Sequence, residues 1–187
     1  MFLRNFLSAE KDCCNFESIK DIMEKTVIRK VEKSDNEALA ELIRNTFTEF
    51  GAPKEGTVYS DPAVFDLYTL FRKEKSVLWV GTVNGVVSGC CGIYPTEGLP
   101  EGCAELAKFY LRPEARGIGL GKSLMMKSIA SAKEMGYEKV YLESLPEFSK
   151  AVKMYENSGF KLLEQPLCNS GHDSCTIWMI RSLEDID

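Results

Sequence analysis

The sequence has no long hydrophobic run, no surplus of positive charge and only one histidine. No stretch approaches about 18 uninterrupted apolar residues, and residues 1–5 break too early for a signal-peptide core, so we expect no membrane partner. Lysine and arginine total 23 against 28 aspartate and glutamate, a net charge of −5, which argues against nucleic-acid binding and favours a cationic substrate such as an amine. The single histidine, His172, cannot form a metal cluster, so no metal is expected.

Cysteine is present, but in a pattern that excludes its usual structural uses. There are seven cysteines, an odd number, and the adjacent pairs Cys13-Cys14 and Cys90-Cys91 suit neither a disulfide framework nor a C-x-x-C zinc site. Apolar neighbours of the second pair predict buried free thiols that behave as small hydrophobic side chains. These features indicate a reducing, cytoplasmic compartment.

The length of 187 residues and the 44% hydrophobic content predict one globular domain. Residues 1–25 carry apolar residues at helical spacing and form an N-terminal extension, either a dimer arm or lid or a segment packed on its own domain. Residues 26–187 form the domain. Its patterns predict an α+β fold with a mixed sheet. The expected strands are 26–32, 76–83, 86–93, 103–111, 139–142, 160–163 and 174–180, and the expected helices are 34–50, 63–72, 119–135 and 149–158.

A glycine-rich turn, RGIGLGK at residues 116–122, lies between a predicted strand and a predicted helix. Its glycines let the backbone approach a ligand, and the helix N-terminus that follows favours an anion such as pyrophosphate. A Walker A loop would need glycine where Arg116 stands, and a dinucleotide fingerprint would need glycine where Lys122 stands. Arg116, Gly119 and Gly121 do meet a third pattern, R-x-x-G-x-G. Taken alone, this hexamer also fits a purely structural turn.

Two segments, residues 105–121 and residues 151–160, lie at a matching separation along the chain, and together they resemble the GNAT superfamily of acyl-CoA-dependent N-acyltransferases. The run ELAKFYLRPEARGIGLG, residues 105–121, resembles the family's fourth strand and pyrophosphate loop in continuous register. Downstream, AVKMYENSGF at residues 151–160 resembles the second signature, A-x-x-x-Y-x-x-x-G-F. The similarity covers residues 26–180.

The resemblance implies a GNAT fold, with a central, mostly antiparallel sheet of about seven strands, splayed fourth and fifth strands and about four flanking helices. It also implies acetyl-CoA as co-substrate, inserted between the splayed strands. The residues expected to bind it are Phe109, Tyr110, Leu111, Arg116, Gly117, Ile118, Gly119, Leu120, Gly121 and Lys122. Many relatives carry asparagine where this chain has Phe148, and Ser149 is expected to replace its cofactor contact.

Glu105 and Tyr155 are the expected catalytic residues. Strand alternation places Glu105 on one face with Ala107, Phe109 and Leu111, and a carboxylate on an apolar face has a raised pKa that suits a general base. Histone-type family members carry their catalytic glutamate at the matching place, whereas other members use another residue or a water chain. Tyr155 matches the family tyrosine that protonates the departing thiolate. The alternatives are an exposed glutamate at a strand start and a core tyrosine on a helix.

The resulting hypothesis is an N-acetyltransferase that moves an acetyl group from acetyl-CoA to a primary amine of a small molecule, peptide or protein. The acceptor groove is expected between the first two helices and the 94–102 loop, lined by Glu49, Tyr59, Glu97 and Glu101, with His172 an exposed loop residue. The alternatives are a non-catalytic acyl-CoA-binding module and an NTPase built on residues 121–123. Family members are often dimers, so a homodimer is also an expectation.

Overall fold

The computed structural model describes residues 26–184, so the predicted extension over residues 1–25 lies outside the described part. Its seven-stranded sheet has the order β1-β2-β3-β4-β5-β7-β6, in which β4 and β5 are parallel and every other neighbouring pair is antiparallel. The strands are β1 (Thr26–Lys30), β2 (Val77–Val83), β3 (Val86–Tyr94), β4 (Cys103–Leu111), β5 (Lys139–Ser144), β6 (Lys161–Leu162) and β7 (Ile177–Ser182). The predicted mixed sheet is confirmed.

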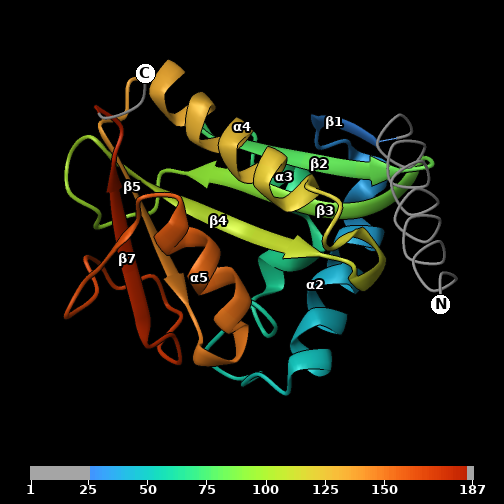
Figure 1. Ribbon diagram of the computed structural model, residues 1–187. Coiled ribbons are helices and arrows are strands. Elements are labelled where there is room, and N and C mark those ends of the chain that lie inside the picture. The colour runs from blue at the N-terminus through green and yellow to red at the C-terminus, as the bar shows by residue number, and fades with distance from the viewer. Residues whose placement is uncertain (1–25, 185–187) are drawn as a thin grey trace, which may run out of the picture.

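Helices cover both faces of the sheet (Figure 1). One core lies between the sheet and the helices α2 (Asn36–Phe50) and α3 (Leu67–Leu70), and the other lies under α4 (Leu120–Glu134) and α5 (Ser149–Asn157). The neighbours Cys90 and Cys91 are buried in opposite cores, as alternation along a strand requires. Both are free thiols, and burial raises the pKa of Cys90 to about 12, so the prediction of inert core cysteines holds for this pair.

The local sequence signals explain most element boundaries. Asn84 and Gly85 both have positive φ, 53° and 79°, as a tight hairpin turn between β2 and β3 requires. Gly51, with φ of 62°, ends α2 and donates its N–H to carbonyls of the last turn. No helix in residues 26–184 is long and apolar enough to cross a membrane.

The expected helix over residues 63–72 is wrong, because it divides into the short 3-10 helix η2 (Pro62–Phe65) and α3. Asp66 separates the two with a non-helical φ of −140°. Its carboxylate accepts the Thr69 N–H at 3.2 Å and the Asn36 side-chain amide at 2.7 Å. Asp66 therefore caps a second helix, as aspartate commonly does at helix N-termini. The apolar periodicity of residues 63–72 instead predicts one continuous helix.

Candidate active site

The site is a pocket at the point where β4 and β5 separate. The two strands pair only from Cys103 opposite Lys139 to Glu105 opposite Tyr141, and beyond that they part. A cavity of about 460 Å³ opens there, lined by β4 residues 105–111 and by residues 143–145 at the end of β5. Side chains of α2 line it on one face of the sheet and side chains of α5 line it on the other. The pocket therefore passes through the sheet.

A β-bulge in β4 decides which side chains face which end of the pocket. Gly92 pairs with Ala107, but Cys90 pairs with Tyr110, so two residues of β4 lie opposite Cys91. Glu105 and Ala107 therefore lie on the α2 face, whereas Phe109 and Leu111 pack into the core under α4 and α5. The prediction that all four share one face is wrong, because simple alternation fails at the bulge.

Glu105 lies at the edge of the pocket on the α2 face. Its Oε2 accepts a hydrogen bond from Thr96 Oγ1, which comes from the loop between β3 and β4. Burial raises the pKa of the Glu105 carboxyl above its ordinary value, Glu143 raises it further, and Thr96 and Lys108 oppose the shift. The structure thus places a carboxylate with a raised pKa in the pocket.

Tyr155 reaches the pocket from α5, on the opposite face of the sheet. Its side chain packs against Phe109 and Phe160, with ring centroids 6.0 and 5.8 Å away, and the residue is 6% exposed. No residue among the described ones hydrogen-bonds its hydroxyl. Burial raises the pKa of the phenol, so the hydroxyl keeps its proton at neutral pH.

The glycine-rich loop forms the other end of the pocket. Gly119 caps α4 with φ of 87°, and the helical ladder begins where Ser123 N donates to Gly119 O at 3.1 Å. The amides of residues 120–122 precede that bond and are free for an anion. Gly121 has a different role, since a Cβ there would lie 2.7 Å from Leu111 Cδ1. Its hydrogen atom lets α4 pack closely on β4.

Not every residue expected at the cofactor lines the pocket. From the loop, the lining residues are Arg116, Gly117, Gly119, Gly121 and Lys122. Ile118 and Leu120 pack into the core, so only their backbone amides could serve a ligand. Ser149 is exposed at the start of α5, while its neighbours Phe148 and Lys150 line the pocket.

Arg116 is held by a carboxylate from α2. Its guanidinium donates to both Glu49 oxygens at 2.6 and 2.8 Å, and also to the Leu111 carbonyl. This bidentate pair lowers the pKa of Glu49. Glu49, expected to line the acceptor groove, is therefore tied to the glycine-rich loop instead.

The resemblance to GNAT proteins implies that Arg116 contacts the pyrophosphate of coenzyme A, so truncating Arg116 to alanine should weaken coenzyme A binding by about 1.5–3 kcal/mol, the scale of a charge-assisted hydrogen bond to phosphate. Titration calorimetry measures the change. Arg112→Ala is the matched control, because Arg112 pairs with Glu41 at 3.4 Å and does not line the pocket. Equal affinities for the two variants would contradict a role for Arg116 at the pyrophosphate.

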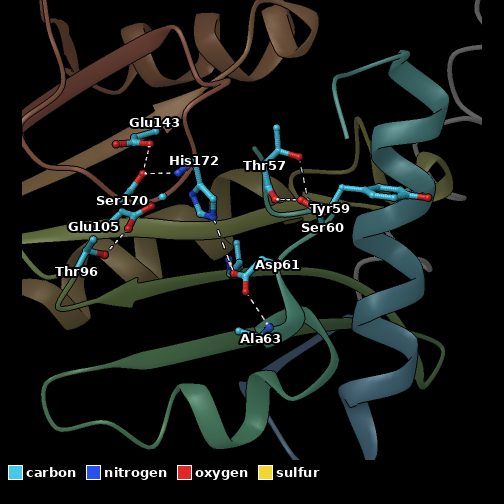
Figure 2. Close-up of polar contacts among 12 residues, drawn as sticks. Thr57, Tyr59, Ser60, Asp61, Ala63, Thr96, Glu105, Glu143, Ser170 and His172 are labelled. Carbon is cyan, nitrogen blue, oxygen red and sulfur yellow. Dashed lines mark hydrogen bonds and ion pairs between the residues drawn. The ribbon is translucent and has the colours of Figure 1, made fainter. Parts of the chain in front are cut away.

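The α2 face of the pocket is completed by the loop between β6 and β7 (Figure 2). His172 lies there, 15% exposed in its side chain, with Nε2 3.9 Å from Asp61 Oδ2. Burial lowers its pKa, and the nearby Lys108 ammonium lowers it further, so the ring is neutral near pH 7. The expectation of an exposed loop histidine is wrong. Lys108, 7% exposed, also lies near Asp61, at 3.5 Å.

Other expected acceptor residues lie elsewhere. Glu97 and Glu101 are exposed and do not line the pocket, although Thr96 of the same loop bonds Glu105. The Tyr59 ring instead lies 4.0 Å from the Arg44 guanidinium. Sequence reasoning missed Glu143, which lines the pocket from β5.

Comparison with known proteins agrees with this architecture. A model of the Acetyltransferase (GNAT) family matches residues 36–160. The chain is 34% identical over 158 residues to the "Uncharacterized N-acetyltransferase YjgM" of Escherichia coli K12, covering 84% of this chain and 95% of that protein.

Solved structures share the fold. An acetyltransferase of the GNAT family from Staphylococcus aureus Mu50 has a TM-score of 0.74 at 22% identity, covering 84% of this chain and 99% of that one. The PaiA N-acetyltransferase of Thermoplasma acidophilum, in complex with coenzyme A, has a TM-score of 0.64 at 19% identity, covering 84% and 98%.

The fold is that of an acyltransferase. The chain belongs to the GNAT family and is an acetyl-CoA-dependent N-acetyltransferase. The predicted family, fold and co-substrate are thereby confirmed, including the splayed β4 and β5.

Proposed function

We propose that this chain transfers an acetyl group from acetyl-CoA directly to a primary amine, with Glu105 as general base and Tyr155 as general acid. The observation that carries the proposal is the continuous pocket, which contains the glycine-rich loop, the open edge of β4, Tyr155 and Glu105. Because Glu105 and Tyr155 approach from opposite faces of the sheet, the proton of the amine and the proton for the thiolate are handled at separate positions.

The residues present fit acetyl-CoA. The β5-facing edge of β4 is open over Phe109, Tyr110 and Leu111, so its backbone N–H and C=O groups can pair with the pantetheine as with another strand. The amides of residues 120–122, with Arg116 and Lys122, can hold the pyrophosphate. When bound there, acetyl-CoA supplies an activated thioester carbonyl.

The chain's own residues supply the proton chemistry. The Glu105 carboxylate accepts the proton of the acceptor ammonium, directly or through water, so that a neutral amine attacks. A main-chain N–H near Phe109 polarises the carbonyl. The Tyr155 hydroxyl, which has no hydrogen-bond partner among the described residues, donates to the departing thiolate. No covalent enzyme intermediate is needed.

The test is turnover of acetyl-CoA with a panel of primary amines, including small amines and a peptide, with thiol release and product mass as readouts. Multiple turnovers with an acetylated amine support the enzyme. Tight acetyl-CoA binding without acetylation of any amine would instead favour a non-catalytic acyl-CoA-binding module. The buried thiols are consistent with a cytoplasmic setting, which we propose as well.

Glu105→Gln should lower kcat/KM most at low pH and least at high pH. In the parent, Glu105 must be ionised to act, so the rate rises as pH passes the carboxyl pKa, which burial holds above its ordinary value. Glutamine cannot accept a proton, and the residual rate then follows the neutral fraction of the amine, whose pKa is about 10. The pH profile of kcat/KM for both proteins measures this. A constant ratio between them across pH would contradict the base assignment.

A further inference from the structure

The α2-face end of the pocket carries more negative than positive charge. Its carboxylates are Glu105, Glu143 and, beside them, Asp61. The ammonium at this end is that of Lys108, 3.5 Å from Asp61 Oδ2. His172 is neutral near pH 7, because burial lowers its pKa. Lys108 pairs with Asp61 and also lowers the pKa of Glu105, so one ammonium faces three carboxylates, and no described residue forms an ion pair with Glu143.

Glu143 is the more rigidly held of these two carboxylates. Tyr141 Oη donates to its Oε1 at 2.8 Å. Ser170 Oγ donates to its Oε2 at 2.7 Å (Figure 2). The backbone N–H of His172 donates to Ser170 Oγ at 3.2 Å, which anchors the β6–β7 loop against the carboxylate. No described residue forms an ion pair with Glu143. Two neutral hydroxyls thus orient a carboxylate in the pocket and leave its charge for a ligand.

Glu143 and Glu105 occupy different positions along the pocket. Glu105 lies opposite Tyr141, and Glu143 follows two residues later on the same face of β5, about 7 Å further along the strand. A carboxylate that pairs with an amine stabilises the protonated, charged form of that amine. The amine that attacks must be neutral, so an ammonium at Glu143 is a group other than the nucleophile.

We propose that Glu143 binds a second, permanently protonated amine of the acceptor, which makes short diamines or polyamines the substrate class of this site. The inference rests on the proposed acetyl transfer at Glu105. Glu143 acts as a specificity-determining residue, and the proton balance of the reaction is unchanged, since the second ammonium keeps its protons throughout.

The test compares three acceptors of similar length that differ at the far end: 1,4-diaminobutane, 1-aminopentane and 4-aminobutanoate. In the parent, kcat/KM should be at least about tenfold higher for the diamine than for 1-aminopentane, and lowest for 4-aminobutanoate. Glu143→Gln should remove the preference, so that the ratio of kcat/KM for the diamine to kcat/KM for 1-aminopentane falls to about one, mainly because KM for the diamine rises. Glu164→Gln, which changes an exposed carboxylate just after β6, should change nothing.

The failure of this proposal can be distinguished from the failure of the proposed function. Acetylation of all three amines without preference, or a preference that survives Glu143→Gln, would overturn the role of Glu143 and leave the transferase intact. If Glu143→Gln does not fold, the order of kcat/KM for the three acceptors in the parent still decides whether the proposal holds.

Calorimetry with 1,4-diaminobutane alone gives a second readout. Binding that weakens tenfold in Glu143→Gln, without acetylation of any amine, would keep the cation site and overturn the transfer. Absence of both would overturn the two proposals together.

Discussion

Tyr155→Phe should lower the turnover number by about 100-fold or more while leaving coenzyme A affinity unchanged. The substitution removes one hydroxyl and keeps the ring that packs between Phe109 and Phe160. Because no described residue hydrogen-bonds that hydroxyl, its removal breaks no bond within the described fold. The loss should therefore appear in kcat and not in stability. Steady-state kinetics, calorimetry with coenzyme A and thermal unfolding measure the three quantities.

Tyr137→Phe provides the matched control for Tyr155→Phe. Tyr137 also loses one hydroxyl, which donates to the Lys75 carbonyl at 2.9 Å, but it does not line the pocket. We expect parental turnover for this control. If Tyr155→Phe also acetylates at the parental rate across pH, the leaving thiolate does not depend on Tyr155, and the acid assignment fails even though the fold stands.

Local chemistry made much of the fold predictable. The bounds of β4 and the C-terminal ends of α2 and β2 fall where the sequence predicts, because a glycine, an Asn-Gly turn or a proline acts within a few residues. The start of α4 at Gly119 was predictable for the same reason. Only the family resemblance predicted that the glycine-rich turn and the Tyr155 helix belong to one site. Neither motif alone indicates which other segments of the chain lie next to it in the folded protein.

The rest of the site depends on contacts that sequence spacing does not encode. Lys108 adopts a left-handed φ of 55°, for which lysine has no preference, so nothing local signalled the bulge. Arg116 meets Glu49 from 67 residues away. Ser170 reaches Glu143 only because the β6–β7 loop folds back over β5. The two hydroxyls that hold Glu143, and hence its role, become visible only in three dimensions.

Gly119→Val should abolish measurable coenzyme A binding, raising the dissociation constant by about 100-fold or more. Gly119 has φ of 87°, and, apart from its chain neighbours, no atom of residues 26–184 lies within 4 Å of a Cβ built there. The added side chain therefore enters the pocket and the space before the amides of α4, where it blocks an approaching pyrophosphate. Backbone strain costs roughly 1–3 kcal/mol, since valine disfavours the left-handed region.

Gly136→Val separates that strain from the blocked site. Gly136 follows the other end of α4 with φ of 83° and equally open surroundings, but it does not line the pocket. Both variants should lose a similar amount of thermal stability without ligand, and coenzyme A should restore stability only in Gly136→Val. Calorimetry and thermal unfolding with and without coenzyme A measure this. A folded Gly119→Val protein with parental affinity would show that the pyrophosphate lies elsewhere, because the strain alone is matched in the control.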